Sequence, residues 1–497
     1  MIDLHRDVID NVPVHWADSS GPSLAALIFR VGLADETLAS TGITHLVEHL
    51  ALSAVKRGSL EMNGFVDATR TVFLAKGRPE EIAEFVNELC LRLSEPRTER
   101  IEHESRVLAT EAQTFNAGIL GILLRLRFGP RRHGLGSYPQ LGLASVDATA
   151  LRAWGEDRFT AGNVTAWMTK PPAGSLRFPL RPGRRVRPVE PQPLDVEYPA
   201  AAPTEASGAG VSFLVRRTVA FTGALSVAVK RTQELLRYEH GLSYAHLGHY
   251  DRFTADLAHA AIVSDAAPDR AREVARRLLD LVEEMAKNGA TETELSEGID
   301  AIERSMSDGE GTPSFLDSNA TDELCGASIL SPHSYLTELR ALTPAATAAA
   351  MRDALTTAIL VGADDKELNT RLHPYPLWSE TPIRGRSYRA KGQSWFQQRP
   401  RIVAGDEGVS FVGADGKVST IRFSDCVAML CGELGTRLLF GADASVINFS
   451  ADLFDGGDRL LRLVDSRIPP ERCAPIVPGR RPLAAPPLAR LPAHAFR

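Results

Sequence analysis

The spacing of apolar residues along the chain predicts strands and helices in alternation. Residues 12–36 hold two apolar stretches around the turn SSGPS and predict a two-stranded hairpin. Residues 69–77, TRTVFLAKG, are rich in residues that favour extended backbone and predict a strand. Amphipathic helices are predicted over 78–95, where Pro79 and two glutamates suit a first helical turn, and over 99–115. This mixture is typical of an α+β fold.

The same order of elements recurs later in the chain. Residues 259–306 read as a strand, a helix that starts near a proline, a turn and an acid-rich helix, and residues 72–111 have that order too. The repeat predicts two homologous α/β-sandwich halves, residues 1–170 and 210–365. Residues 171–209 are rich in proline and show no sustained period, so they predict a linker.

The last part of the chain changes to short alternating strands. An Asp415-Gly416 turn between two such strands predicts a hairpin, and residues 437–450 predict a second one. Residues 458–468 predict a short closing helix. Two hairpins and a terminal helix indicate a small, partly open barrel.

These elements define a small β-rich domain over residues 396–470, and their pattern resembles PH-like domains. An irregular polar stretch, residues 366–395, precedes the domain, and a proline-rich tail, residues 471–497, follows it. A chain of 497 residues is too long for one core, and about three domains agree with its length.

Composition narrows the possible partners and compartment. The net charge of −6 indicates no general affinity for nucleic acid or for an anionic membrane. The five cysteines include no C-x-x-C pair, which favours a reducing compartment over a disulfide framework. Neither an apolar leader at the N-terminus nor a run of about 20 apolar residues is present, so we expect a cytoplasmic protein without a signal peptide or membrane span.

The stretch TGITHLVEHLALS, residues 41–53, carries the candidate chemistry. On a helix, His45 and His49 lie one turn apart on one face and can bind one metal ion. Zinc accepts two imidazole nitrogens in this arrangement, and Glu48 can reach a water at the open position and act as general base. The order H-x-x-E-H is that of the inverzincins. An ordinary helix face that carries two histidines by chance is the alternative.

A catalytic zinc site needs a third protein ligand, and the acid-rich helix offers two candidates. Glu104 and Glu111 are seven residues apart and therefore lie on the same face of that helix. The spacing alone does not choose between them.

Together these segments resemble the pitrilysin-like metallopeptidases, which include insulin-degrading enzyme and the mitochondrial processing peptidases. In that family H-x-x-E-H is followed by a helix with the third ligand, and SRVLATEAQ looks like that helix. The resemblance implies Zn²⁺ held by His45, His49 and Glu111, with Glu104 as a supporting residue. The segment between His49 and Glu111 is shorter than usual for the family, which leaves the shape of the cleft open.

The second half adds a pair that the family also carries. ELLRYEHGLSYAHLG contains Arg237 and Tyr244, seven residues apart, and the resemblance implies that they hold the substrate carbonyl and the developing oxyanion. A guanidinium and a phenol can both donate hydrogen bonds to such a charge. A surface arginine and a half-buried tyrosine without a catalytic role are the alternative.

The resemblance covers residues 10–365 and implies a zinc-dependent endopeptidase that acts on small or unfolded peptides. Such sites are often completed across a clamshell by another subunit, so we expect a homodimer in which Arg237 and Tyr244 act in trans; a heterodimer is the alternative. The peptide is expected to add a strand to a sheet edge in the first domain. A protease dedicated to one leader peptide and a non-catalytic peptide-binding or assembly protein remain open as alternative functions.

Overall fold

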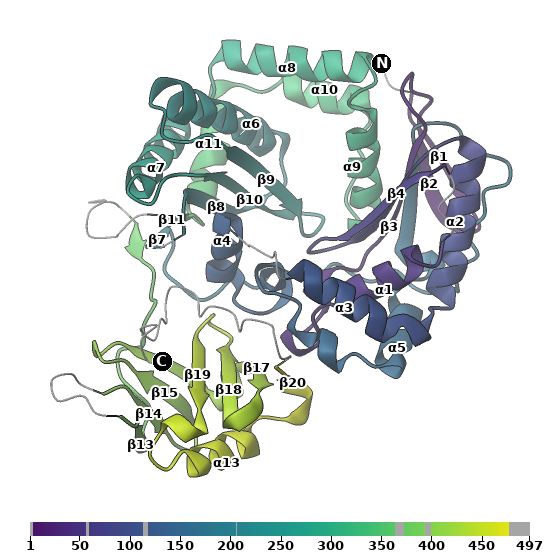
Figure 1. Cartoon of the computed structure of the whole chain (residues 1–497). Coiled ribbons are helices and arrows are strands. Elements are labelled where there is room, and N and C mark those ends of the chain that lie inside the picture. Colours follow the sequence, from purple (N-terminus) through teal and green to yellow (C-terminus); the bar gives the residue numbers. More distant parts are fainter. Residues whose placement is uncertain are drawn as a thin grey trace.

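The computed structural model describes residues 3–55, 59–112, 118–204, 206–362, 372–392 and 399–476. Two six-stranded sheets stand side by side, each covered by helices, and a unit of two four-stranded sheets lies below them in the view of Figure 1. The fold is α+β, as the sequence predicts. In the described part of the chain, no helix is long and apolar enough to cross a membrane.

The first sheet has the strand order β1-β2-β6-β3-β5-β4. Its strands are β1 (His5–Ile9), β2 (Val12–Trp16), β3 (Leu24–Phe29), β4 (Glu61–Val66), β5 (Thr71–Lys76) and β6 (Val164–Met168). The hairpin predicted over residues 12–36 is wrong, because β6 lies between β2 and β3 and pairs with both. The turn SSGPS reverses the chain, but the buried apolar strand β6 occupies the position between the two arms. The strand predicted over 69–77 is confirmed as β5.

The second sheet has the order β12-β7-β11-β8-β10-β9, and five of its strands repeat the topology of the first sheet. Its strands are β7 (Ala200–Ala202), β8 (Ala209–Arg216), β9 (His246–Arg252), β10 (Leu257–Ser264), β11 (Ile359–Val361) and β12 (His373–Pro374). The remaining outer strand differs, because β12 runs parallel to β7 whereas β1 runs antiparallel to β2. β2 runs parallel to β6 as β7 does to β11, and the next three pairings are antiparallel in both sheets. The internal repeat predicted from the sequence is therefore present in the order of the strands.

Helices of each half cover one face of its own sheet. The helices that follow in the chain are α1 (Ile43–Leu52), α2 (Pro79–Ser94), α3 (Ile101–Glu111), α4 (Gly118–Phe128), α5 (Ala148–Arg158), α6 (Val219–Gln233), α7 (Ala271–Asn288), α8 (Glu292–Ser307), α9 (Thr312–Cys325), α10 (Pro332–Arg340) and α11 (Pro344–Leu355). In the first half, α1, α2 and α5 cover one face of the sheet. Leu27 and Phe29 of β3 point to this face, because alternate residues of a strand point to the same side. α6, α7 and α11 form the matching layer of the second half.

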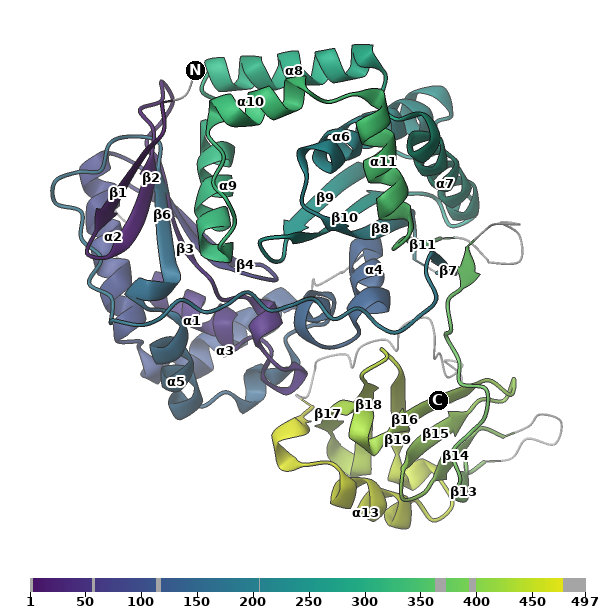
Figure 2. The same cartoon turned by 180° about the vertical axis from the view of Figure 1, so that it is seen from behind.

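The opposite faces of the two sheets are covered by an exchange of helices. α4 belongs to the first half by sequence, yet Ile119, Leu123 and Leu126 pack on β7, β10 and β11 of the second sheet. α9 belongs to the second half but lies against the first sheet, as Figure 2 shows from behind. Its residues Leu316 and Ala320 pack on that sheet. Each half thus buries one face of its sheet with a helix of the other, and the two halves share their cores.

The C-terminal unit consists of two four-stranded sheets with a helix. The strands are β13 (Arg386–Arg389), β14 (Arg401–Ala404), β15 (Gly408–Val412), β16 (Val418–Arg422), β17 (Cys426–Cys431), β18 (Thr436–Gly441), β19 (Val446–Ser450) and β20 (Cys473–Pro475), and the helix is α13 (Gly457–Arg467). Both predicted hairpins and the closing helix are confirmed. The apolar core lies between the two sheets and α13.

Several strands fall inside ranges that the sequence assigns to connecting segments. β7 lies within residues 171–209, β13 within 366–395 and β20 within 471–497. Each is three or four residues long and joins a sheet whose other strands come from elsewhere in the chain. Much of the tail, residues 477–497, lies outside the described residues. The resemblance of this unit to PH-like domains stays a prediction.

Candidate metal centre

A buried carboxylate, that of Glu36, caps the start of helix α1. Glu36 accepts hydrogen bonds from the backbone N–H groups of Gly42 and Thr44, each at 2.9 Å. Gly42 has a φ of 100°, a left-handed conformation that glycine adopts without strain. The Glu36 carboxylate therefore satisfies two of the unpaired donors at the helix start. Burial raises its pKa to about 7, although these hydrogen bonds oppose the shift.

The pKa of Glu36 predicts a pH-dependent contribution to stability. Between the ordinary pKa of about 4.5 and the native value of about 7, the folded chain holds a proton that the unfolded chain has lost. This contribution therefore falls as pH rises, by about 1.4 kcal/mol per pH unit inside the window. Glu36→Gln has no such proton to lose. Its free energy of unfolding relative to the native chain should increase between about pH 5 and about pH 7 in urea unfolding curves. Parallel pH profiles for the two proteins would contradict the assignment.

α1 and α3 bring two imidazoles and a carboxylate together. One ligand atom each of His45, His49 and Glu111 lies within 4.8 Å of the others. His49 Nε2 is 3.7 Å from Glu111 Oε1, and the two imidazole rings meet edge to face with centroids 4.8 Å apart. Two nitrogens and one oxygen on adjoining helices are the donor set of a three-ligand site that keeps a position open. The residues therefore fit a zinc ion.

Glu48 lies beside this cluster, almost fully buried. Its Oε2 is 3.5 Å from His45 Nε2 and 3.8 Å from His49 Nε2, and it has no hydrogen-bond partner. Burial, together with the charges of Glu111 and Glu104, raises the pKa of Glu48 to about 8. A buried carboxylate oxygen without a donor costs free energy unless a proton or a cation compensates it. This orphaned atom supports the presence of a cation in the cluster.

Backbone geometry makes room for the Glu48 side chain. Gly64 lies on the edge strand β4, which packs on α1. A Cβ atom at this position would lie 2.2 Å from Glu48 Oε1 and 2.8 Å from Leu52 Cδ1. A larger side chain at position 64 would therefore have to displace the Glu48 carboxylate and the end of Leu52.

His49 and Glu111 are supported by α3. Glu104 Oε2 is 3.5 Å from His49 Nδ1, on the side of the ring opposite the cluster. Burial acts to raise the pKa of Glu104, but the hydrogen bonds and the charge of Arg100 have the larger combined effect. The pKa of Glu104 therefore lies below its ordinary value. Glu104 is therefore an ionised acceptor that can hold a proton on His49 Nδ1 and leave Nε2 for a metal ion. The side chain of Glu111 is about half exposed at the end of the helix.

His45 is held by a residue from a distant loop. Gln140, at the start of η6 (Leu141–Ser145), places its side-chain amide nitrogen 2.6 Å from His45 Nδ1. Burial and the neighbouring His49 lower the pKa of His45 to about 4, so the imidazole is neutral near pH 7. A neutral imidazole is the form that binds metal ions.

Arg237 and Tyr244 lie together in the second half. Arg237 belongs to a single π-helical turn, η8 (Glu234–Glu239), which continues α6, and Tyr244 lies in the loop before β9. The Arg237 Cζ is 4.7 Å from the centroid of the Tyr244 ring, which is 75% exposed. The histidines and glutamates of the metal cluster all belong to the first half, whereas Arg237 and Tyr244 belong to the second. The expected catalytic role of this pair stays a prediction.

Two residues of the site carry no distinctive signal in the sequence. Gly64 follows an asparagine in a short segment without a clear pattern, and Gln140 lies in an irregular loop without a periodic pattern. Neither residue type is distinctive by itself. Their roles depend on which strand passes Glu48 and which loop passes His45, and both are tertiary contacts.

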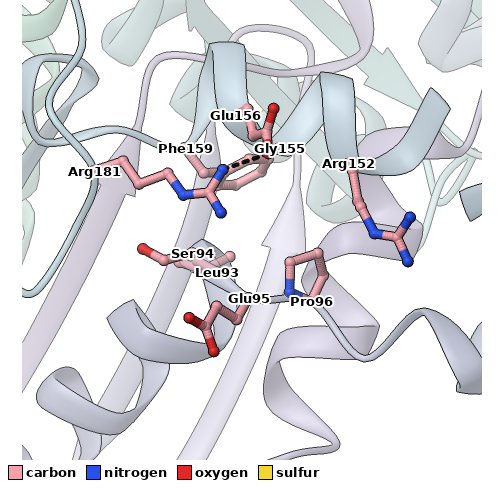
Figure 3. A pocket seen from close by; sticks show the side chains of 9 residues that line it. All are labelled: Leu93, Ser94, Glu95, Pro96, Arg152, Gly155, Glu156, Phe159 and Arg181. Carbon is pink, nitrogen blue, oxygen red and sulfur yellow. Dashed lines mark hydrogen bonds and ion pairs between the residues drawn. The ribbon is translucent and has the colours of Figure 1, made fainter. Parts of the chain in front are cut away.

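A cavity of about 210 Å³ lies outside this cluster, at the ends of α2 and α5 (Figure 3). Leu93, Pro96 and Phe159 line it, and Glu156 and Arg181 form an ion pair at its side. None of the cluster residues contributes to it. A site for an extended peptide needs an open groove and a free strand edge, so we do not assign the chemistry to this cavity.

Comparisons with solved structures agree on the fold. A peptidase M16 inactive domain from Pseudomonas fluorescens aligns with a TM-score of 0.60 and 14% identity, covering 72% of this chain and 97% of that one. A protease from Helicobacter pylori gives 0.61 and 12%, with 73% and 99% covered. The periplasmic protease PqqL from Escherichia coli gives 0.54 and 12%, with 89% and 56% covered. No protein-family model matches the sequence, and no curated protein does. The chain therefore has the M16-peptidase, or pitrilysin-like, fold.

Proposed function

We propose that this protein is a zinc-dependent endopeptidase that hydrolyses small or unfolded peptides. The observation that carries the proposal is the cluster of His45, His49 and Glu111 with the buried, unpartnered Oε2 of Glu48 beside it. The fold supports it, since several proteins with this fold are described as proteases. Zinc bound there would supply a Lewis acid and a water of lowered pKa.

Glu48 performs the proton transfers in this proposal. Its carboxylate takes a proton from the attacking water and returns it to the leaving amine. The raised pKa of Glu48 favours the protonated form in the absence of a cation. A nearby cation favours the ionised form, so a bound metal ion would ready Glu48 to act as base.

The peptide is proposed to lie along β4. Among the described residues, this strand is one of the two edge strands of the first sheet, and it packs on α1. An extended peptide can add to such an edge through backbone hydrogen bonds. The half-buried Arg237 and the exposed Tyr244 of the second half are proposed to complete the site of a partner subunit in a homodimer and to donate to the oxyanion.

Two other functions remain as alternatives. A protease dedicated to one leader peptide would use the same residues and differ in selectivity. A non-catalytic binding protein is suggested by the similar domain from Pseudomonas fluorescens, which is described as inactive. The buried Glu48 favours catalysis, because a binding module gains nothing from an unpartnered carboxylate oxygen.

The test combines metal analysis with a peptide library. The purified chain is expected to contain one zinc ion per protomer and to cleave unstructured peptides at many sites, as read by mass spectrometry. A chelator should stop cleavage, and added zinc should restore it. Cleavage of few or no library peptides by the zinc-loaded protein would favour a dedicated protease or a binding role. Failure to bind zinc would refute the proposal.

Gly64→Ala is expected to impair catalysis more than metal binding. The added methyl group would displace the Glu48 carboxylate, because its Cβ would lie 2.2 Å from Oε1. A misplaced base should lower kcat at least about tenfold, whereas the three ligands keep their helices. Steady-state kinetics and zinc analysis of the same preparation measure both effects. Gly155→Ala on α5, where a Cβ meets nothing within 4 Å, is the matched control and should retain activity. Equal kinetics for both variants would show that β4 tolerates the methyl group.

A further inference from the structure

An apolar contact joins the C-terminal unit to the first half. Phe440 of β18 meets the Tyr138 ring edge to face, with centroids 6.1 Å apart. Gly129 approaches the turn after β18 so closely that a Cβ would lie 2.4 Å from Ala442 O. The contact is built from buried residues of both parts: Leu38, Ala39, Leu135, Tyr138 and Leu141 from the first half, and Ala428, Leu430, Leu438, Phe440, Val446 and Ala474 from the C-terminal unit.

Two first-half residues of this contact flank Gln140 in the chain. Tyr138 and Leu141 lie close to it in the chain on either side, and both are buried against the C-terminal unit. The Tyr138 ring is also covered from the α4 side, where the Arg125 guanidinium lies 5.0 Å from its centroid. The loop is therefore held between α4 and the C-terminal sheet.

The same loop rests on the start of α1. The Gly142 N–H donates to Thr41 O at 3.1 Å. Gly42, the N-cap of α1, approaches so closely that a Cβ there would lie 2.7 Å from Leu143 Cγ and 3.0 Å from Gln140 Cβ. A displacement of this loop would thus shift Gln140 relative to the helix that carries His45.

Gln140 and Glu48 lie at different ring nitrogens of His45. The side-chain amide of Gln140 is 2.6 Å from Nδ1, which leaves Nε2 as the nitrogen on the side of Glu48. That nitrogen faces Glu48 Oε2 at 3.5 Å. Binding of a metal ion at Nε2 requires the proton of the neutral ring to be on Nδ1. The amide oxygen of Gln140 can accept a hydrogen bond from Nδ1–H and so support that form of the ring.

We propose that the C-terminal unit is a structural part of the metal centre: it clamps the loop over residues 138–143, and Gln140 in that loop holds Nδ1 of His45 so that Nε2 is left to bind the metal. This inference rests on the zinc site proposed above. Gln140 acts as a positioning residue, since it touches His45 and not the metal. The C-terminal unit then serves the site through this loop, whatever it binds elsewhere.

The first experiment measures zinc affinity of the full chain, by competition of the metal-free protein with a chromophoric chelator. Gln140→Leu, which removes the partner of Nδ1, should weaken binding about tenfold to a hundredfold. Gln140→Glu should bind zinc at least as tightly as the native chain, because a carboxylate accepts from Nδ1–H. A merely space-filling role for Gln140 would predict equal affinity for the leucine variant, and that result would overturn the inference.

The second experiment separates the clamp from general destabilisation. Phe440→Leu alters the contact with Tyr138, whereas Phe449→Leu makes the same change in the internal core of the C-terminal unit. The first should weaken zinc binding several-fold, and the second should leave it unchanged. Equal zinc affinities of Phe440→Leu and the native chain would overturn the role of the C-terminal unit. Absence of zinc binding by the native chain would instead refute the proposed metal centre and this inference with it.

Discussion

Glu48→Gln is expected to abolish peptide cleavage while zinc remains bound. The amide has the size of the carboxylate but accepts no proton from water, so the loss should be about 10²–10⁴-fold or more. Its neighbours His45, His49 and Glu111 are unchanged, so the zinc content should equal that of the native protein. Turnover of a cleaved library peptide and metal analysis of the same sample measure the two quantities.

The matched control for this variant is His49→Gln. It keeps Glu48 and removes one of the two imidazoles, so zinc content and activity should fall together, and excess zinc should restore part of the activity. Glu48→Gln should gain nothing from excess zinc. Residual cleavage by Glu48→Gln within tenfold of the native rate would mean that another group serves as base, and Glu48 would lose its assigned role.

Arg30→Met is expected to cause the largest loss of stability among the changes considered. Arg30 and Asp35 form a buried ion pair, and Arg30 Nη1 also donates to Thr69 O at 2.7 Å and to Asp35 Oδ2 at 3.0 Å. Removal of the guanidinium leaves the Asp35 charge buried without its partner, which typically costs about 3–5 kcal/mol. The free energy of unfolding in urea measures this loss.

Arg181→Met provides a control of the same chemistry at the surface. Arg181 pairs with Glu156, and both side chains are about half exposed, so its loss should cost less than about 1 kcal/mol. Addition of Asp35→Asn to Arg30→Met should recover part of the lost stability, because the unpaired charge is then gone. Similar losses for Arg30→Met and Arg181→Met would show that burial does not set the strength of these pairs.

Local patterns predicted much of the secondary structure. The helix over 78–95, the strand over 69–77 and the hairpin around Asp415-Gly416 each follow from residues adjacent in the chain. The exchange of α4 and α9 between the sheets, by contrast, has no local signature. Both helices carry apolar faces, and nothing in their sequences states which sheet they cover.

The wrong hairpin shows the same limit within one sheet. β2 and β3 are apolar strands around a good turn, and a hairpin satisfies every local rule. β6, more than a hundred residues further along, is buried on both faces and takes the position between them. Pairing between strands depends on which apolar surfaces are buried together, and this is a property of the whole fold.

The pairing of His45 with His49 and the position of Glu48 can be predicted from the sequence alone, because both follow from the 3.6-residue turn of one helix. The spacing of Glu104 and Glu111 likewise predicts that both acids lie on one face of α3. The packing of α3 on α1 places Glu111 toward the histidines and Glu104 on the far side of His49. The contact of Gly64 with Glu48 and that of Gln140 with His45 arise from tertiary packing, and no local pattern predicts them. These contacts join segments far apart in the chain, and the burial of distant apolar surfaces is what brings such segments together.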